Sequence, residues 1–139
     1  MKPKFIILEG ISGAGKTALL HPVGKLSNYA DLSVARFTPS CWVYNQLYSR
    51  TNVDYEVMNR AIMVEHDVHV VWLRCSSETA LERCRLKDDD NVEDLSRADY
   101  LFGQYFTRYT AIQQIHIVNT EQHINDSIAE IRDKVYGSY

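Results

Sequence analysis

Residues 4–20 read Lys4-Phe5-Ile6-Ile7-Leu8-Glu9-Gly10-Ile11-Ser12-Gly13-Ala14-Gly15-Lys16-Thr17-Ala18-Leu19-Leu20. Within this stretch, residues 10–17 match the pattern G-x-x-x-x-G-K-[ST] of a phosphate-binding loop. The apolar run at 5–8 predicts a buried parallel strand, and residues 17–20 begin a predicted helix. A strand, a glycine-rich loop and a helix in this order are the context that phosphate binding requires. The stretch therefore predicts a nucleotide-binding site in an α/β fold.

Each part of this loop has a physical role in binding phosphate. The glycines let the backbone wrap closely, so that consecutive N–H groups point at phosphate oxygens. Lys16 supplies a positive charge to the β- and γ-phosphates, and Thr17 offers its hydroxyl to Mg²⁺. The N-terminus of the following helix also favours an anion. We therefore expect ATP phosphates to bind at Gly10, Ile11, Ser12, Gly13, Ala14, Gly15, Lys16 and Thr17, with Thr17 as the metal ligand.

Length and composition limit the remaining possibilities. The 139 residues, of which 45% are hydrophobic and 24% charged, predict a single globular domain over residues 1–139. The formal net charge of −3 gives no overall basic footprint, so a nucleic-acid partner is not favoured, although a local basic cleft remains open. The three cysteines lack metal-ligand spacing. No apolar run could cross a bilayer and no signal peptide is recognisable, so we expect a cytoplasmic protein.

Strand and helix signals alternate along the chain. Strands are expected at residues 5–8, 31–37, 68–73 and 115–118. Helices are expected from 17 to about 21 or 26, and at 39–48, 55–64, 77–86, 95–112 and 126–135, with residues 88–91 breaking the fourth of them. Repeated strand–helix units predict an α/β fold of three layers, with a small parallel sheet between helices. Ligands of such sheets bind beyond the carboxyl ends of the strands, where the loop, Arg36 and Asn119 should gather.

A second informative stretch reads Ala35-Arg36-Phe37-Thr38-Pro39-Ser40-Cys41-Trp42-Val43-Tyr44-Asn45. It resembles the thymidylate kinase family and, more widely, the deoxynucleoside and deoxynucleotide kinases with phosphate loops. That family carries Asp-Arg-Tyr, a serine three residues after the tyrosine, and Ala-Tyr-Gln further along. The chain matches this pattern in order at Arg36, Phe37, Ser40, Tyr44 and Asn45, conservatively at Phe37 and Asn45. Residues 5–10 are also similar to the first strand of the family.

The resemblance implies a P-loop NTPase fold of the nucleotide-kinase type, and transfer of a phosphoryl group from ATP with Mg²⁺ to a deoxynucleotide-type acceptor. Arg36 would hold the acceptor phosphate, because a guanidinium can grip phosphate with two parallel N–H bonds. Tyr44 would lie near the sugar or base, and the amide of Asn45 would read a pyrimidine edge. The expected acceptor site thus comprises Glu9, Arg36, Phe37, Ser40, Tyr44, Asn45 and Tyr55. The alternative from the residues alone is that the aromatic side chains are core and Arg36 is a surface ion-pair partner.

Residues 76–87 resemble the family's helix leading into a lid over the phosphates. By this resemblance Arg83 and Arg85 are the candidate catalytic cations besides Lys16 and Arg36, since phosphoryl transfer depends mainly on charge stabilisation. Asn119 falls where the family places a loop beside the adenine. The alternative for residues 76–87 is a solvated basic face, and the alternative for Asn119 is a capped turn before the last helix. A homodimer is a further open point.

Three departures from the family bear on activity. Ala35 stands where the family has the aspartate of Asp-Arg, and Ser12 stands where an aspartate contacts the acceptor sugar. Very little chain separates Thr17 from Arg36, so the protein resembles a reduced member of a kind associated with phages. Glu9, Asp54 and Glu56 are candidate replacement carboxylates, and an engineered alanine at 35 is another explanation. Two alternatives to a deoxynucleotide kinase follow: a kinase of a nucleoside or hydroxymethyl-pyrimidine hydroxyl, including one within DNA, and a nucleotide-binding protein with weak or no turnover.

Overall fold

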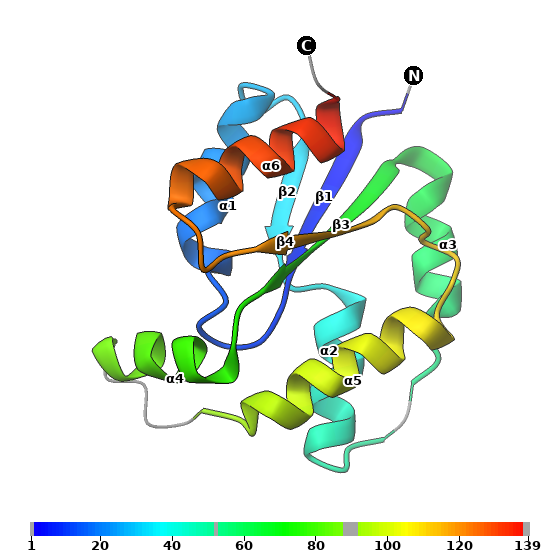
Figure 1. Cartoon of the computed structure of the whole chain (residues 1–139). Coiled ribbons are helices and arrows are strands. Elements are labelled where there is room, and N and C mark those ends of the chain that lie inside the picture. The colour runs from blue at the N-terminus through cyan, green and yellow to red at the C-terminus, as the bar shows by residue number, and fades with distance from the viewer. Residues whose placement is uncertain (1, 52, 88–91, 138–139) are drawn as a thin grey trace.

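The structure, a computed structural model, describes residues 2–51, 53–87 and 92–137. Figure 1 shows its helices and strands in chain order. They are β1 (Lys4–Glu9), α1 (Lys16–Leu26), β2 (Leu32–Ala35), α2 (Thr38–Leu47), α3 (Glu56–Glu65), β3 (Asp67–Arg74), α4 (Ser77–Leu86), α5 (Leu95–Arg108), β4 (Ile115–Asn119) and α6 (Ile124–Tyr136).

The four strands form one parallel sheet in the order β2-β1-β3-β4. Helices α1 and α6 pack together and contact the sheet at β2, β1 and β4, while α3 contacts β3 and α5 packs on α2 (Figure 1). Crossover helices are what a parallel sheet requires, and they cover both of its faces. The predicted three-layer α/β fold with a small parallel sheet is confirmed.

The buried core explains this layering. Along β1, Ile6 and Leu8 join the cluster that contains Leu19 and Val23 of α1 and Ile131 of α6. The alternate residues Phe5 and Ile7 join a second cluster, against which side chains of α3 and α5 pack. Successive side chains of a strand point to opposite faces, so an unbroken apolar run is the signature of a strand covered on both sides.

The structure corrects several predicted element boundaries. The strand expected at 31–37 is shorter, because Arg36 has a positive φ of 77° that ends the extended backbone. The helix expected at 95–112 ends at Arg108, and the carboxylate of Glu56 accepts a hydrogen bond from the N–H of Ala111 at 3.0 Å. Helix α1 runs to Leu26, the longer of the two expected ends. The helix break expected at residues 88–91 lies outside the described residues.

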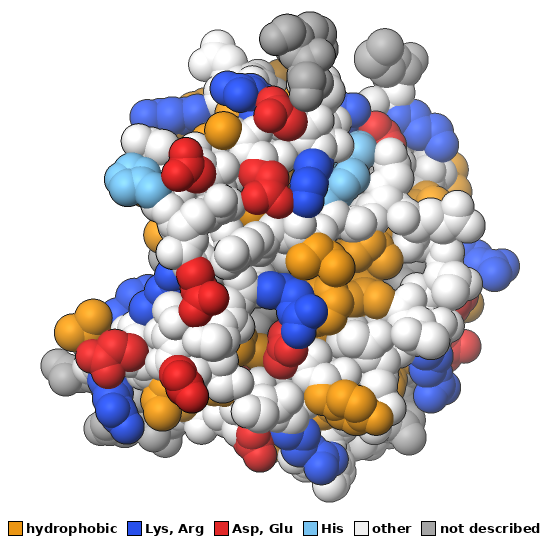
Figure 2. Space-filling view, viewed as in Figure 1, with side chains coloured by type: hydrophobic (Ala, Val, Ile, Leu, Met, Phe, Trp, Pro, Cys, Tyr) orange, Lys and Arg blue, Asp and Glu red, His pale blue; other side chains and the backbone are white. Residues whose placement is uncertain are grey.

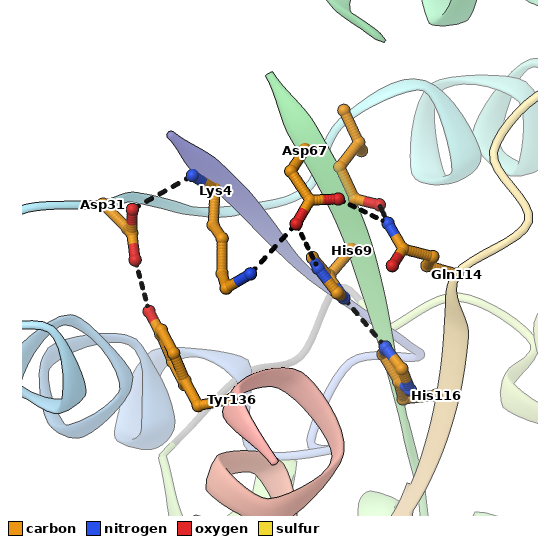
Figure 3. Close-up of polar contacts among 8 residues, drawn as sticks. Lys4, Asp31, Asp67, His69, Gln114, His116 and Tyr136 are labelled. Atoms are coloured by element: carbon orange, nitrogen blue, oxygen red, sulfur yellow. Dashed lines mark hydrogen bonds and ion pairs between the residues drawn. The ribbon is translucent and has the colours of Figure 1, made fainter. Parts of the chain in front are cut away.

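A polar network joins the strands at the edge of the sheet opposite the phosphate loop (Figure 3). Asp67, the first residue of β3, accepts hydrogen bonds from Lys4 of β1 at 2.9 Å and from the side chain of Gln114 at 2.7 Å. His69 lies between Asp67 and His116, with ring-nitrogen distances of 3.1 Å to the carboxylate and 3.0 Å to the second imidazole. This network ties together the amino-terminal ends of three strands.

The surface carries charges of both signs. Figure 2 shows acidic and basic side chains interspersed over α6, and hydrophobic side chains gathered in one patch near β4 and α5. Ile117 of β4, about half exposed, is one of the large apolar side chains that reach solvent. Within the described residues, no helix has both the length and the hydropathy needed to cross a membrane.

Candidate functional site: a phosphate loop between two clefts

The phosphate loop lies at the carboxyl edge of the sheet, between β1 and α1. Gly10, Gly13 and Gly15 have φ angles of 148°, 80° and 105°, which side chains rarely tolerate. A Cβ atom at Gly10 would lie 2.5 Å from the carbonyl oxygen of Leu73, and one at Gly13 would collide with the carbonyl of Ala80. The loop therefore packs so closely on β3 and α4 that these positions require glycine.

The lysine of the loop is buried. The Lys16 side chain is 7% exposed, and its ammonium group donates to the carbonyl oxygens of Gly10 and Ile11, the latter at 2.8 Å. Burial, helped by the nearby Arg36 guanidinium, lowers the pKa of Lys16 to about 8, although the charges of Glu9 and Glu93 act in the opposite direction. A cavity of about 240 Å³ opens above the lysine, and it is lined by Ser12, Gly13, Gly15, Lys16, Thr17, Arg36, Cys84 and Lys87.

A second cleft lies on the other side of the loop. It measures about 310 Å³ and is lined by Gly13, Gly15, Ala18, Leu19, Arg83, Lys87, Thr120, Gln122, Ile124 and Ser127. Arg83 bridges its walls, donating to the carbonyl oxygens of Gly13 at 3.0 Å and Thr120 at 2.6 Å. The hydroxyl of Thr120 in turn donates to the carbonyl of Ala14 at 2.7 Å. The turn after β4 is thereby fixed against the loop.

Glu9 connects the loop to the start of α2. The side chain is fully buried, and its Oε2 atom accepts from the backbone N–H groups of Phe37 at 3.0 Å and Ser40 at 2.7 Å. Its Oε1 atom has no hydrogen-bond partner among the described residues. Burial raises the pKa of Glu9 to about 7, although the two N–H groups and Lys16 act in the opposite direction. The carboxylate therefore stabilises a helix N-terminus directly beside the phosphate loop.

Arg36 has a strained backbone at the end of β2. Its φ of 77° lies in the left-handed region, which is uncommon for a residue with a side chain. The backbone N–H donates to the carbonyl of Leu8 at 3.0 Å, which holds this conformation. The exposed side chain lines the phosphate cavity, with its guanidinium carbon 5.3 Å from the centre of the Tyr44 ring. Strain of this kind is often found at functional sites.

Glu93 is a residue that the sequence did not reveal. Its carboxylate accepts from the Ser12 hydroxyl at 2.6 Å, from the Ser12 N–H at 3.2 Å and from the Tyr44 hydroxyl at 3.1 Å. Desolvation raises the pKa of Glu93, but these hydrogen bonds more than offset it and leave the pKa below its usual value. The sequence offered one signal, because Ser12 stands where the kinase family that the chain resembles has an aspartate. The signal indicates that the loop lacks a carboxylate, but it does not indicate which other residue provides one.

The remaining expected acceptor-side residues lie together around α2. The amide nitrogen of Asn45 donates to the hydroxyl of the buried Tyr55 at 2.9 Å. Phe37 precedes the first turn of α2 and packs against Phe5, with ring centres 5.4 Å apart. Ser40 is buried, and its hydroxyl donates to the Phe37 carbonyl at 3.2 Å. Asn45 and Tyr55 thus contact each other, while Phe37 and Ser40 form the helix start held by Glu9.

Two residues proposed from the lid and adenine regions lie away from the cavities. The Arg85 side chain is 69% exposed, and its guanidinium lies 3.8 Å from the carboxylate of Glu82 one helical turn earlier. The side chain of Asn119 accepts from the N–H of Glu121 at 2.8 Å, as in a capped turn. Of the two cations Arg83 and Arg85, the structure brings only Arg83 to the loop.

Two of the candidate replacement carboxylates also lie elsewhere. Asp54 accepts from the N–H of Glu56 at 3.0 Å and so caps the start of α3. The carboxylate of Glu56 accepts the hydrogen bond from the N–H of Ala111, away from the loop. Among the residues that the structure describes, the carboxylates beside the loop are therefore Glu9 and Glu93.

Among residues 2–51, 53–87 and 92–137, no three side chains of His, Cys, Asp or Glu form a cluster that could hold a metal ion. A larger cavity of about 850 Å³ lies along α5 beside Trp72 and Arg74. Its lining contains no residue of the phosphate loop, so its size does not make it the nucleotide site.

Comparison with known proteins supports the fold. No family model and no curated protein sequence matches the chain. The solved structure of deoxyadenosine kinase from M. mycoides with bound dCTP is similar, with a TM-score of 0.68, 13% identity, and coverage of 96% of this chain and 100% of that chain. The same kinase with the products dCMP and a flexible dCDP gives a TM-score of 0.62 at 14% identity, covering 95% and 98%. The chain therefore has the fold of the P-loop deoxynucleoside kinases.

Proposed function

We propose that this protein transfers the γ-phosphoryl group of ATP, with Mg²⁺, to a deoxynucleotide-type acceptor, and that residues 1–139 act as a single kinase domain. The observation that carries the proposal is the phosphate loop with a cleft on each side. One cleft is lined by Thr120 and Arg83, and the other by Ser12 and Arg36, which contact Glu93 and Tyr44 respectively. A site that transfers a group between two nucleotides needs two binding sides that meet at the phosphates.

The donor is assigned to the cleft of about 310 Å³. Its walls combine apolar side chains such as Leu19 and Ile124 with polar groups, as expected for a base and sugar. The phosphates would lie on the N–H groups at the start of α1, with Lys16 turning from the loop carbonyls toward the β- and γ-phosphates. Arg83 and Lys87 border both the loop and this cleft, so they are the proposed lid cations.

The acceptor is assigned to the side of Arg36 and Tyr44. The Arg36 guanidinium would hold an acceptor phosphate, because it is exposed and lines the phosphate cavity. Glu93 would orient the acceptor, since it is the carboxylate that contacts Ser12 and Tyr44 on this side. In this proposal Glu93 replaces the carboxylates that the family places at positions 12 and 35.

The chemical step needs little covalent help from the protein. An acceptor oxygen forms a bond to the γ-phosphorus, the bond from that phosphorus to the β–γ bridging oxygen breaks, and ADP leaves. A hydroxyl acceptor would also release its proton, and in this proposal Glu93 would receive it. Lys16, Arg36 and Arg83 would stabilise the charge that spreads over the transferred group.

Mg²⁺ fits the donor set beside the loop. This ion prefers oxygen ligands and usually takes only one or two from the protein, the rest being phosphate oxygens and water. The exposed Thr17 hydroxyl borders the phosphate cavity and would be the direct ligand. When bound, Mg²⁺ would neutralise phosphate charge. The orphaned Oε1 of Glu9, buried next to the loop, is suited to accept from a water held there.

A nucleoside is the second candidate acceptor, because the similar solved structures are named deoxyadenosine kinase. A screen with γ-labelled ATP over nucleosides, nucleoside monophosphates and oligonucleotides separates these classes. It should include Ala35→Asp, because a raised rate would show that the family aspartate is a missing catalytic group. ATP binding without labelling of any acceptor would contradict the proposed activity and favour a nucleotide-binding protein.

A further inference from the structure

A row of stacked cations and aromatic rings leads away from the phosphate cavity along α2. Arg36 lies 5.3 Å from the Tyr44 ring centre, and the rings of Tyr44 and Tyr48 lie 6.2 Å apart with an angle of 11° between their planes. Beyond them, the guanidinium carbon of Arg50 lies 5.2 Å from the centre of the Tyr48 ring. We call these four residues the stacking track.

Local structure explains why the four side chains align. Tyr44 and Tyr48 are four residues apart, so their side chains are neighbours on one face of α2. The chain then turns back, and the N–H of Arg50 donates to the carbonyl of Asn45 at 2.9 Å. This bond keeps Arg50 beside the end of the helix. The track therefore starts at the proposed acceptor phosphate site and continues beyond it.

The outer half of the track is open to solvent. Tyr48 is 52% exposed, Arg50 is also exposed, and Tyr44 is half-buried with its hydroxyl on Glu93. A single bound nucleotide would use Arg36 and Tyr44, which leaves Tyr48 and Arg50 without a role in it. Aromatic faces interleaved with arginines along a path are the chemistry that binds successive bases and phosphates of a single strand.

We propose that the stacking track binds a single-stranded oligonucleotide whose terminal nucleotide is the acceptor. This inference rests on the proposed function and names its substrate class. Tyr48 stacks on a base beyond the terminal nucleotide, and Arg50 contacts a backbone phosphate. The acceptor oxygen of the terminal nucleotide then takes the γ-phosphoryl group in the step given above, with release of ADP. The net charge of −3 is compatible, because the track is a local basic path rather than a basic surface.

Binding to a short oligothymidylate labelled with fluorescein tests the track without depending on catalysis. Tyr48→Ala should weaken binding about tenfold, the effect of losing one base–aromatic stack. Arg50→Ala should reduce the slope of log affinity against log salt by about 0.7, the contribution of one single-strand phosphate contact. Tyr100→Ala and Arg132→Ala, which change an exposed tyrosine and arginine on other helices, should leave both quantities unchanged. Circular dichroism verifies that each variant is folded.

Transfer assays then separate this inference from the proposed function. With γ-labelled ATP, the ratio of oligonucleotide labelling to mononucleotide labelling should fall about tenfold in Tyr48→Ala, following the loss of one stacked base. Equal effects on both acceptors, or affinities for the oligonucleotide that match the control variants, would show that the track is only structural. Track-dependent binding of the strand with no transfer to any acceptor would instead leave the track standing and overturn the kinase assignment.

Discussion

Glu93 accepts a hydrogen bond from the hydroxyl of Ser12 at 2.6 Å, although the two residues are 81 positions apart in the chain. This contact joins the segment before α5 to the phosphate loop. It places a carboxylate beside a loop that has none of its own, on the side proposed for the acceptor, and Ala35 and Ser12 stand where the kinases that the sequence resembles carry aspartates. The contact therefore makes Glu93 the first residue to test.

Glu93→Gln should lower kcat about a hundredfold, because an acceptor that is no longer oriented by the carboxylate reacts much more slowly. The affinity for ATP, measured separately by calorimetry, should change far less than kcat. The control is Glu82→Gln, a similar change at an exposed position of α4. A kcat equal to that of the control would remove Glu93 from the mechanism.

Lys16→Ala should lower transfer by about a hundredfold or more, since one preorganised charge at the transferred group is lost. Lys25→Ala makes the same change at an exposed position in the last turn of α1 and should retain activity. Initial rates with γ-labelled ATP measure both. ATP-dependent transfer that survives in Lys16→Ala would contradict the role of the loop.

The buried pair Glu9 and Lys16 should give stability an unusual dependence on pH. The pKa of Glu9 is about 7 in the folded protein against 4.5 when exposed, so the folded state binds more protons between these values. Stability should therefore fall as pH rises from 4.5 to 7, by at most about 1.4 kcal/mol per pH unit. The pKa of Lys16 is about 8 against 10.5, so the folded state binds fewer protons there and stability should rise from pH 8 to 10.5.

Urea unfolding at a series of pH values measures both the fall in stability between pH 4.5 and 7 and the rise between pH 8 and 10.5. Glu9→Gln should remove the fall and leave the rise, and Lys16→Met should remove the rise and leave the fall. Parallel curves for wild type and variants over the whole range would show that neither group has a shifted pKa.

The polar network in Figure 3 should respond to acid. Desolvation lowers the pKa of His116 from 6.5, and neighbouring His69 and Lys134 lower it further. The folded state therefore binds fewer protons than the unfolded state just below pH 6.5, and the stability due to a neutral His116 is lost as pH falls through its folded pKa. His116→Gln should flatten this loss in urea unfolding. A loss of stability in acid that is equally steep in His116→Gln and in the wild type would contradict this role of His116.

Tyr105→Phe should destabilise the protein by about 1–3 kcal/mol, the cost of leaving a buried donor without an acceptor. The Tyr105 hydroxyl lies 2.8 Å from the Thr38 hydroxyl and accepts from the Asn59 amide at 2.8 Å, which joins α5 to α2 and α3. Tyr100→Phe on the same helix is the control, because Tyr100 is 65% exposed and should cost less than about 0.5 kcal/mol. Thermal unfolding measures the loss of stability in both variants. Equal losses in Tyr105→Phe and Tyr100→Phe would show that the hydrogen bonds of Tyr105 do not stabilise the fold.

The sheet and the loop were predictable because their signals are local. Eight consecutive residues carry the loop pattern, and apolar runs such as that of β3 have the length and composition of strands covered on both faces. The position of Arg36 near the loop was predictable because it follows β2 at the edge of the sheet where the loop lies. Its left-handed backbone was not, since it accompanies a hydrogen bond to Leu8 of another strand.

The remaining site residues depend on contacts that no local pattern records. Arg83 and Arg85 are equivalent in sequence, and only the packing of α4 against Gly13 brings one to the loop and turns the other to solvent. The segment after α5 likewise contacts Glu56 of another helix, through the N–H of Ala111. Glu93 and Ser12 are 81 positions apart, so their contact depends on the tertiary fold and not on local sequence. Tertiary contacts of this kind set both helix ends and site composition.

The burial of Lys16 links nucleotide binding to proton uptake. Near pH 8 a fraction of this amine is neutral, because its pKa is about 8. Phosphates arriving beside it would favour the ammonium form, so each binding event would draw protons from the buffer in proportion to that fraction. The heat of ATP binding should therefore vary with the ionisation enthalpy of the buffer, and the affinity should decline in alkaline solution. At a fixed nucleotide concentration, the fraction of the protein with bound nucleotide would therefore depend on the pH of the solution.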